Sequence, residues 1–282
     1  MNSATTLTIA QALQQAHANL PQTQDPKREA EYLLCAALNC DRAYLYTWPE
    51  KPLSIHAADT YQRYVDQRQR GKPLAYITER QAFWTLDLYV NEHVLIPRPE
   101  TELLVENTLK LLMSQPNSQV ADLGTGSGAI ACALAIERPD WEITATDQSP
   151  AALEIAQQNA QRHNLTQINF VSGNWFAPLH GQRFDAIISN PPYIYAQDPH
   201  LQREGLPYEP DSALVSAESG LQDLRVLIEN APKHLKPGGY LLLEHGYNQA
   251  PAVQALFAQE NYDHIETLYD LNHTPRVTWA QY

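Results

Sequence analysis

Residues 190–193 read Asn-Pro-Pro-Tyr and follow an apolar run, residues 184–189, that is typical of a buried strand. The two prolines fix φ and carry no N–H, so this segment offers carbonyl oxygens without neighbouring donors. Asn190 adds a side-chain carbonyl, and Tyr193 has a flat face on which a planar group can stack. Such a set of acceptors suits the two hydrogens of an –NH₂ group, on either an amide or the exocyclic amine of adenine.

A nitrogen of this kind is a poor nucleophile because its lone pair is delocalised into the plane of the group. Acceptors held on both hydrogens can pyramidalise the nitrogen and aim its lone pair at an electrophile such as a sulfonium methyl group. We therefore expect Asn190, Pro191 and Tyr193 to be catalytic, and Asn190, Pro191, Pro192 and Tyr193 to bind the substrate. A stiff turn without chemistry is the alternative interpretation, since proline pairs are common in turns.

A glycine-rich loop lies between an earlier apolar strand and a helix, where backbone N–H groups can approach a ligand closely. It consists of Gly124, Thr125, Gly126, Ser127 and Gly128. With Ala129 it satisfies the dinucleotide-binding spacing G-x-G-x-x-A, so it fits NAD and S-adenosylmethionine equally well.

Three further side chains are expected to bind the same cofactor. Asp147 ends the second predicted strand, where a carboxylate can accept both ribose hydroxyls of an adenosine. Asn174 and Trp175 follow the third strand, where Asn174 can meet the exocyclic amine of adenine and Trp175 or Phe176 can pack on its ring. The structural alternatives are a charge at a helix start for Asp147, core packing for the aromatic residues, and a loop-fixing role for Asp122. Asn190 is included among the cofactor-binding residues.

From residue 119 onward, apolar strand segments alternate with helical ones. The strand segments are residues 119–124, 142–147, 168–173, 184–189 and 240–246, followed by 264–270 and 276–282. Alternation of this kind predicts an α/β fold with a seven-stranded, mostly parallel, doubly wound sheet. Ser149 and Pro150 predict a helix start, and Gly238-Gly239 are expected to end the helix before the fifth strand.

The N-terminal part has a different pattern, with apolar residues three and four apart in residues 8–20, 26–39 and 56–70. We expect a helical substrate-docking domain over residues 1–80, a hairpin linker over 81–97 and the catalytic domain over 98–282. Tyr44, Tyr46 and Trp48 could line a docking surface, although a small domain's core explains them better.

Composition limits the class of protein further. The chain has 282 residues, with 44% hydrophobic and 18% charged, as in ordinary globular proteins. It shows neither a signal-peptide pattern nor an apolar run of the ~20 residues that span a bilayer, so we expect no membrane partner. Its three cysteines lack CxxC spacing, which favours a reducing, cytoplasmic location, and no grouping of residues predicts a metal.

Charge is unevenly distributed. Residues 1–80 hold nine Lys/Arg and eight Asp/Glu, which leaves ten and twenty-four, a net charge of −14, for residues 81–282. Binding to phosphate backbones depends on Lys and Arg, so we expect no direct nucleic-acid binding.

The motifs together resemble one family. PRPETE (97–102), DLGTGSGAIA (122–131), SNPPYI (189–194), LLLEHG (241–246) and the flanking FW (83–84) are similar to those of the HemK/PrmC family. These are class I, S-adenosylmethionine-dependent methyltransferases that modify the glutamine side chain of class 1 peptide chain release factors. The resemblance covers essentially the whole chain, and it implies that residues 124–128, Asp147 and Trp175 bind S-adenosylmethionine. It also implies that residues 190–193 hold the glutamine amide of the Gly-Gly-Gln loop and that the N-terminal domain helps dock the release factor, tuning translation termination.

Two positions depart from the family pattern. Asn174 stands where an aspartate is more usual, which predicts weaker cofactor affinity at most. DLNHTPRVT (270–278) replaces a glycine-containing turn before Arg276. Arg98 and Glu100 match the family, and an interdomain contact near the cofactor is our hypothesis for both.

Four alternatives remain open. A glutamine methyltransferase of a ribosomal protein would use the same chemistry, and only the resemblance favours release factors. Adenine-N6 methyltransferases of DNA or RNA share the Asn-Pro-Pro-Tyr solution but must extrude a base and grip phosphates. An NAD-dependent oxidoreductase could use the glycine loop, and an inactive binding module would be expected to have damaged motifs.

Overall fold

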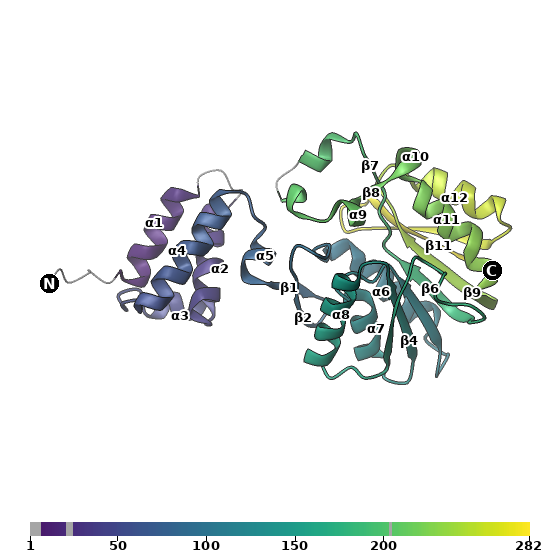
Figure 1. Ribbon diagram of the computed structural model, residues 1–282, viewed down its shortest axis with the longest axis horizontal. Coiled ribbons are helices and arrows are strands. Elements are labelled where there is room, and N and C mark those ends of the chain that lie inside the picture. The colour runs from purple at the N-terminus through teal and green to yellow at the C-terminus, as the bar shows by residue number, and fades with distance from the viewer. Residues whose placement is uncertain (1–6, 21–24, 203–204) are drawn as a thin grey trace. The chain divides into compact units, whose positions relative to one another are not determined.

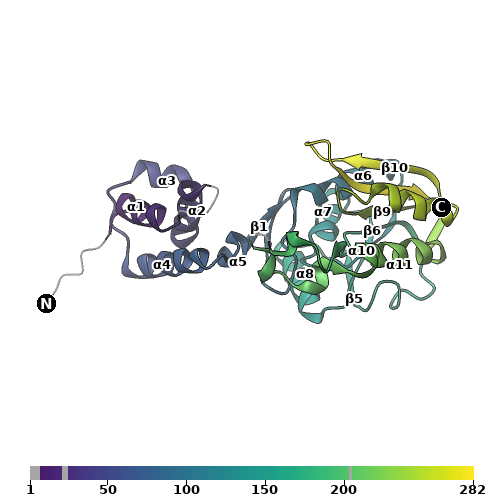
Figure 2. The same ribbon diagram turned by 90° about the horizontal axis from the view of Figure 1, so that it is seen from above.

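The computed structural model describes residues 7–20, 25–202 and 205–282, which form two compact units, residues 1–79 and 80–282 (Figures 1 and 2). Residues 1–6, on which part of the signal-peptide expectation rests, lie outside the described residues. No helix of the described residues is both long and apolar enough to cross a membrane.

Unit 1 is helical. Its described helices are α1 (Ile9–Asn19), α2 (Pro26–Leu38), α3 (Arg42–Thr47), α4 (Ile55–Gln69) and α5 (Leu74–Thr78). The side chains of Thr8, Asp25, Asp41 and Ser54 accept backbone N–H groups at the starts of the first four. The short helices α3 and α5 were not predicted, since five or six residues cannot show helical periodicity.

A hairpin of β1 (Arg80–Phe83) and β2 (Leu86–Tyr89) begins unit 2. We expected a linker here, but Phe83, Leu86 and Leu88 are buried in the core of this unit. In addition, Asn159 hydrogen-bonds both the N–H and the carbonyl of Tyr89, at 2.7 and 2.9 Å. The hairpin is therefore part of the larger unit.

A seven-stranded sheet forms the centre of unit 2, which confirms the predicted fold class. Its strands are β3 (Gln119–Leu123), β4 (Glu142–Asp147), β5 (Ile168–Ser172), β6 (Phe184–Ser189), β9 (Leu235–Glu244), β10 (Asp263–Tyr269) and β11 (Pro275–Gln281). Their order is β10-β11-β9-β6-β3-β4-β5, and only the pairs that include β11 are antiparallel. The carboxyl ends of β3, β4, β5 and β6 consequently share one edge.

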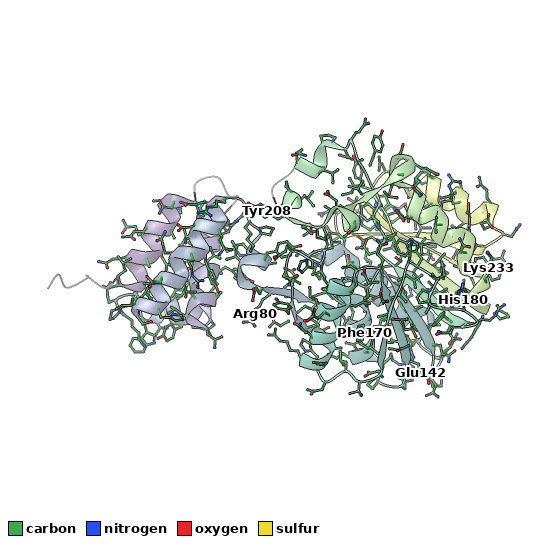
Figure 3. All side chains as sticks on the ribbon, viewed as in Figure 1. Arg80, Glu142, Phe170, His180, Tyr208 and Lys233 are labelled. Carbon is green, nitrogen blue, oxygen red and sulfur yellow. The ribbon has the colours of Figure 1, made fainter. Side chains whose placement is uncertain are left out.

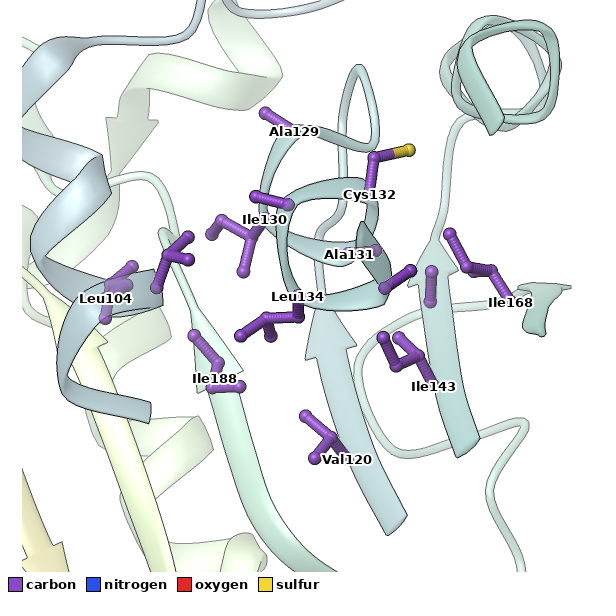
Figure 4. Close-up of a cluster of buried hydrophobic side chains, with 14 of the residues drawn as sticks. Leu104, Val120, Ala129, Ile130, Ala131, Cys132, Leu134, Ile143, Ile168 and Ile188 are labelled. Atoms are coloured by element: carbon purple, nitrogen blue, oxygen red, sulfur yellow. The ribbon is translucent and has the colours of Figure 1, made fainter. Parts of the chain in front are cut away.

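Helices cover both faces of this sheet. Because alternate residues of each strand point to opposite sides, neighbouring strand residues belong to two different cores. Val120 belongs to the core shared with α6 (Glu102–Leu111), α7 (Ala129–Glu137) and α8 (Pro150–Arg162), and Figure 4 shows it with Ile143 and Ile188 around Leu134. Its neighbour Ala121 belongs to the core shared with α11 (Gln222–Asn230) and α12 (Ala250–Gln259). As predicted, Ser149 caps α8 by accepting the N–H of Ala152.

The prediction for Gly238-Gly239 was wrong. The preceding helix ends at Asn230 and a short turn, η4 (Ala231–Lys233), follows it, so both glycines lie within β9. Gly238 has a φ of +79°, and the pairing with β6 shifts between Phe184 and Ala186. The glycines therefore serve a bend in the strand.

Short elements lie at the carboxyl edge of the sheet. They are η1 (Pro99–Thr101), β7 (Ile194–Tyr195), η2 (Pro199–Gln202), η3 (Leu206–Tyr208), α9 (Asp211–Leu214), β8 (Val215–Ser216) and α10 (Ala217–Gly220). In Figure 3, Tyr208 lies toward the upper side of unit 2, whereas Glu142, the first residue of β4, lies at the lower side. The segment after β7 is thus far from the amino-terminal edge.

Candidate active site

A cavity of about 300 Å³ lies at the carboxyl edge of the sheet. It brings together most of the residues predicted for the site: Gly124, Thr125, Gly126, Ser127, Asp147, Asn174, Trp175, Asn190 and Pro192. Three predicted residues, Gly128, Pro191 and Tyr193, do not line it. Ligand binding at this edge is the general rule for open α/β sheets.

The glycines of the loop have different tasks. Gly126 has a φ of +56°, and a Cβ placed on it would meet nothing within 4 Å, so its backbone faces open space. A Cβ on Gly124 would lie 3.2 Å from the Trp175 ring. A Cβ on Gly128 would lie 3.1 Å from the Ala156 Cβ, so this glycine serves the packing of α7 against α8.

Asp147 connects two elements of the cavity wall. Its Oδ2 accepts the Gly126 N–H at 2.9 Å, and its Oδ1 accepts the Ser149 N–H at 2.8 Å. Burial raises the pKa of Asp147, and the backbone N–H donors oppose this rise. Each carboxylate oxygen still has a second lone pair with which to receive a ligand hydroxyl.

Asp122 is fully buried and lies outside the cavity lining. Its Oδ2 accepts the Thr125 hydroxyl at 2.6 Å and the Ala131 N–H at 3.2 Å, which favours the loop-fixing alternative. Burial raises the pKa of Asp122 to about 7. Its Oδ1 has no hydrogen-bond partner among the described residues.

The aromatic pair after β5 divides between cavity and core. Trp175 lines the cavity and touches Gly124, whereas Phe176 is buried and stacks on His234 with ring centroids 4.8 Å apart. Asn174 is exposed at the cavity wall. Of the two aromatics, only Trp175 is placed to meet a ligand.

Asn190 is held by a chain of hydrogen bonds that runs through η1 and β9. Its Nδ2 donates to the Thr101 hydroxyl at 3.2 Å, and Thr101 donates to Glu244 Oε2 at 2.7 Å. The Tyr193 hydroxyl donates to Oε1 of the same carboxylate at 3.1 Å. The sequence analysis did not predict Thr101 and Glu244 as site residues. Thr101 lies in the PRPETE motif and Glu244 in the LLLEHG motif, and these two motifs were the feature of the sequence that could have indicated them.

The exit of the Asn-Pro-Pro-Tyr segment is also fixed. The Tyr193 carbonyl accepts the Gln249 Nε2 at 3.0 Å, and Gly220 lies so close that a Cβ on it would be 2.1 Å from that carbonyl. The carbonyls of Asn190 and Pro191 accept no hydrogen bond from the part of the chain that the structure describes. These two acceptors match the predicted character of the segment.

The opposite wall of the cavity was not predicted. It consists of His93, Val94, Leu95, Pro97, Pro210, Ser212, Ala213 and Val215, among others. Buried Glu209 joins its two segments by accepting the Ile96 N–H at 3.1 Å and pairing with Arg98. Arg98 therefore has its partner within unit 2, and the hypothesis of an interdomain contact is not needed for it.

Glu100, Arg276 and His245 have local partners as well. Arg276 donates to Asp270 at 3.0 Å and lies 3.9 Å from Glu100, again within unit 2. The turn before it forms without glycine, because His273 takes a φ of +57° and Asp270 accepts two backbone N–H groups. His245 is a packed residue, as expected, with its Nδ1 donating to the Gly246 carbonyl and burial lowering its pKa.

Family models match both units. The PrmC N-terminal domain model matches residues 11–78, and the methyltransferase small domain model matches residues 99–203. The second match contains the glycine loop and Asn190.

Whole-chain relatives agree with these matches. A release factor glutamine methyltransferase of Xylella fastidiosa is 51% identical over 250 residues, 89% of this chain and 91% of the relative. One of Shewanella oneidensis is 43% identical over 97% of this chain and 96% of the relative. The structure of a release-factor-specific protein-(glutamine-N5) methyltransferase from Alicyclobacillus acidocaldarius has 32% identity and a TM-score of 0.43, covering 69% of this chain and 98% of that one. The identity and coverage of the Xylella and Shewanella relatives show that this chain belongs to the release factor glutamine methyltransferase family.

Proposed function

We propose that this protein transfers a methyl group from S-adenosylmethionine to the side-chain amide nitrogen of the glutamine in the Gly-Gly-Gln loop of class 1 peptide chain release factors, and so tunes translation termination. The observation that carries the proposal is that Asn190, Gly126 and Asp147 line one cavity. A set of acceptors for an amide and a cradle for a nucleoside are thus adjacent.

The residues present fit S-adenosylmethionine. Open space above Gly126 leaves room for the close approach of a ligand to the backbone, and Asp147 would accept the ribose hydroxyls. Trp175 would pack on adenine and Asn174 would accept from its amine. The loop residues 124–128 would hold the rest of the molecule, with Gly128 acting through helix packing.

The glutamine amide would be held by Asn190 and the prolines. Asn190 Oδ1 would accept one hydrogen, and Pro192 would form part of the wall. The Pro191 carbonyl lies outside the cavity lining but accepts no hydrogen bond from the described residues, and it would accept the second hydrogen. Tyr193 is partly exposed, and its hydroxyl is fixed on Glu244. Because Tyr193 does not line the cavity, we expect its ring, held by this bond, to meet the planar amide at the border of the cavity.

These residues act by orientation and electrostatics. When bound, S-adenosylmethionine would supply a sulfonium methyl group whose carbon–sulfur bond breaks, with the electron pair retained by sulfur, as the nitrogen–carbon bond forms and the nitrogen releases one proton to water. Fixed acceptors concentrate the nitrogen lone pair toward the electrophile and stabilise the positive charge that develops on nitrogen. A strong base is not required.

Unit 1 would contribute to docking of the release factor. Tyr46 and Trp48 are 60% and 55% exposed, so the core explanation preferred from the sequence was wrong for these two residues. Tyr32 and Ile55 of the same unit are also exposed. Exposed aromatic residues of this kind are typical of protein interfaces.

Incubation with labelled S-adenosylmethionine and four substrates tests the proposal. They are a release factor, its Gln→Ala variant in the Gly-Gly-Gln loop, a large-subunit ribosomal protein and duplex DNA. We expect label only in the unaltered release factor. Label in the ribosomal protein or DNA without label in the release factor would contradict the proposal, and so would calorimetric binding of NAD without binding of S-adenosylmethionine.

A further inference from the structure

We propose that Thr101 and Glu244 are positioning residues that fix the orientation of the Asn190 side-chain amide, so that its oxygen is the atom presented to the substrate. The inference rests on the proposed function, because it takes Asn190 Oδ1 as an acceptor for the glutamine amide. It assigns a task to two family motifs, PRPETE and LLLEHG, that do not themselves supply the acceptors.

Glu244 is the starting point, since it is a carboxyl group that is only 2% exposed at the end of β9. Within the described residues it takes part in no ion pair. Its two oxygens accept instead from Thr101 and Tyr193. A carboxylate can only accept, so both hydroxyl hydrogens are directed toward it.

The direction of the remaining bond follows from this constraint. A threonine hydroxyl has one hydrogen, and the Thr101 hydrogen is used on Glu244 at 2.7 Å. The Thr101 oxygen can therefore only accept from Asn190, which it does from Nδ2 at 3.2 Å. The Asn190 amide cannot turn round without placing its oxygen against the Thr101 oxygen, a contact between two acceptors.

The orientation of Asn190 determines whether the substrate meets a hydrogen-bond acceptor or a donor. With Nδ2 on Thr101, Oδ1 remains available to a substrate –NH₂ group. In the reversed orientation, Asn190 would present its own –NH₂ group, and two donors would face each other. The path from Glu244 to Asn190 thus determines whether the site attracts or repels an amide nitrogen.

Variants at Thr101 separate positioning from simple packing. Thr101→Val keeps the shape and removes the hydroxyl, whereas Thr101→Ser keeps the hydroxyl. Thr108→Val is a matched control, because Thr108 is also buried but donates to the Leu104 carbonyl of its own helix. We expect Thr101→Val to lower kcat by roughly 10- to 100-fold, with KM for the release factor within about twofold of the wild-type value. Thr101→Ser should retain most of the wild-type kcat.

Glu244→Gln provides a test of polarity. The new side-chain amide can donate to Thr101, which frees the Thr101 hydrogen to donate to Asn190 Oδ1 and permits the reversed orientation. We expect a fall in kcat similar to that of Thr101→Val, although the shape and the contacts are conserved.

The pH profile adds a readout that packing alone would not change. Burial raises the pKa of Glu244 to about 7, against the hydrogen bonds from Thr101 and Tyr193. The charged or titratable neighbours are Arg98, Glu100, Tyr193, His245 and Arg276. Protonated Glu244 could donate to Thr101 in the reversed sense, so kcat of the wild type should rise with pH through about 7, and this step should be missing in Glu244→Gln.

Nitrogen-15 NMR of the Asn190 side chain, assigned by its loss in Asn190→Ala, reports the orientation without turnover. We expect the Nδ2 signal to shift in Thr101→Val and Glu244→Gln but not in Thr101→Ser or Thr108→Val. Unchanged signals and unchanged kcat would overturn the inference, and so would equal losses in Thr101→Ser and Thr101→Val. If the wild type failed to methylate the release factor, the proposed function would fail, while the NMR comparison would still decide the orientation.

Discussion

Asn190 uses the two halves of its amide differently, since Nδ2 is bound to Thr101 and Oδ1 is left for a ligand. The sequence predicted Asn190 from its place after a strand and before two prolines. It could not predict Thr101, which lies 89 residues away in the chain and meets Asn190 only because η1 and β6 end at the same edge. Side-chain contacts across such separations have no local pattern.

Asn190→Ala should lower kcat by about 10²- to 10³-fold, because it removes an oriented acceptor from the transition state. The affinity for S-adenosylhomocysteine, measured by calorimetry, should change little. Asn174→Ala is the matched control in the same cavity wall, and we expect it to weaken cofactor binding and leave kcat nearly unchanged. Unchanged turnover in Asn190→Ala would show that this residue is scaffolding.

At the level of elements, the strands and long helices were predictable because their periodicity reflects burial on a sheet or helix face. The wall formed by residues 93–97 and 210–215 was not, since it has no periodicity and depends on one buried acid, Glu209. The turn after β10 shows the same limit. Its conformation depends on Asp270 and on a left-handed His273, not on the glycine that the family pattern suggests.

Gly220 provides a test of how the Asn-Pro-Pro-Tyr segment is held. Gly220→Ala would place a Cβ 2.1 Å from the Tyr193 carbonyl oxygen. We expect this contact to lower the free energy of unfolding by about 1–3 kcal/mol, in addition to the strain of a positive φ, and to lower kcat. Gly181 has a φ of +75°, similar to the +86° of Gly220, but a Cβ on Gly181 would meet nothing within 4 Å. Gly181→Ala should therefore lower the free energy of unfolding by only about 1 kcal/mol and leave kcat unchanged. Equal effects of the two substitutions, in urea unfolding and in assays, would count against this role for Gly220.

At the scale of the whole molecule, the stability of unit 2 depends on pH, because unit 2 buries two acidic side chains and burial disfavours their charged forms. Asp122 and Glu244 are buried acids, each with a pKa of about 7, above their ordinary values. At each of these two side chains, the folded protein therefore binds a proton more tightly than the unfolded chain does. Their contribution to stability is lost as pH rises from about 4 through about 7.

We predict that the free energy of unfolding of unit 2 falls between pH 5 and pH 8, by an amount on the order of 3 kcal/mol for each acid. Asp122→Asn keeps the acceptor for Thr125 and removes one of the two titrating groups, so it should make this pH dependence about half as steep. Urea unfolding of both proteins across this pH range measures the difference. Parallel curves for the two proteins would show that Asp122 does not titrate there.

The docking role of unit 1 also belongs to this scale. Trp48→Ser should raise KM for an intact release factor several-fold and leave kcat unchanged, because it removes an exposed anchor outside the cavity. With a short Gly-Gly-Gln peptide as substrate, the same variant should behave as the wild type. Leu271→Ser, at a fully exposed residue of unit 2, is the control, and equal KM values for both variants would argue against docking by this surface.

The central claim, that one amide nitrogen is methylated at the Asn-Pro-Pro-Tyr segment, is tested most directly by mass spectrometry of the product. A release factor purified without prior methylation is incubated with S-adenosylmethionine and either wild-type enzyme or Asn190→Ala, and fragment ions then locate the added mass. We predict one methyl group on the side chain of the Gly-Gly-Gln glutamine with the wild type and nearly none with the variant. A methyl group on any other residue, or none with the wild type, would contradict the claim.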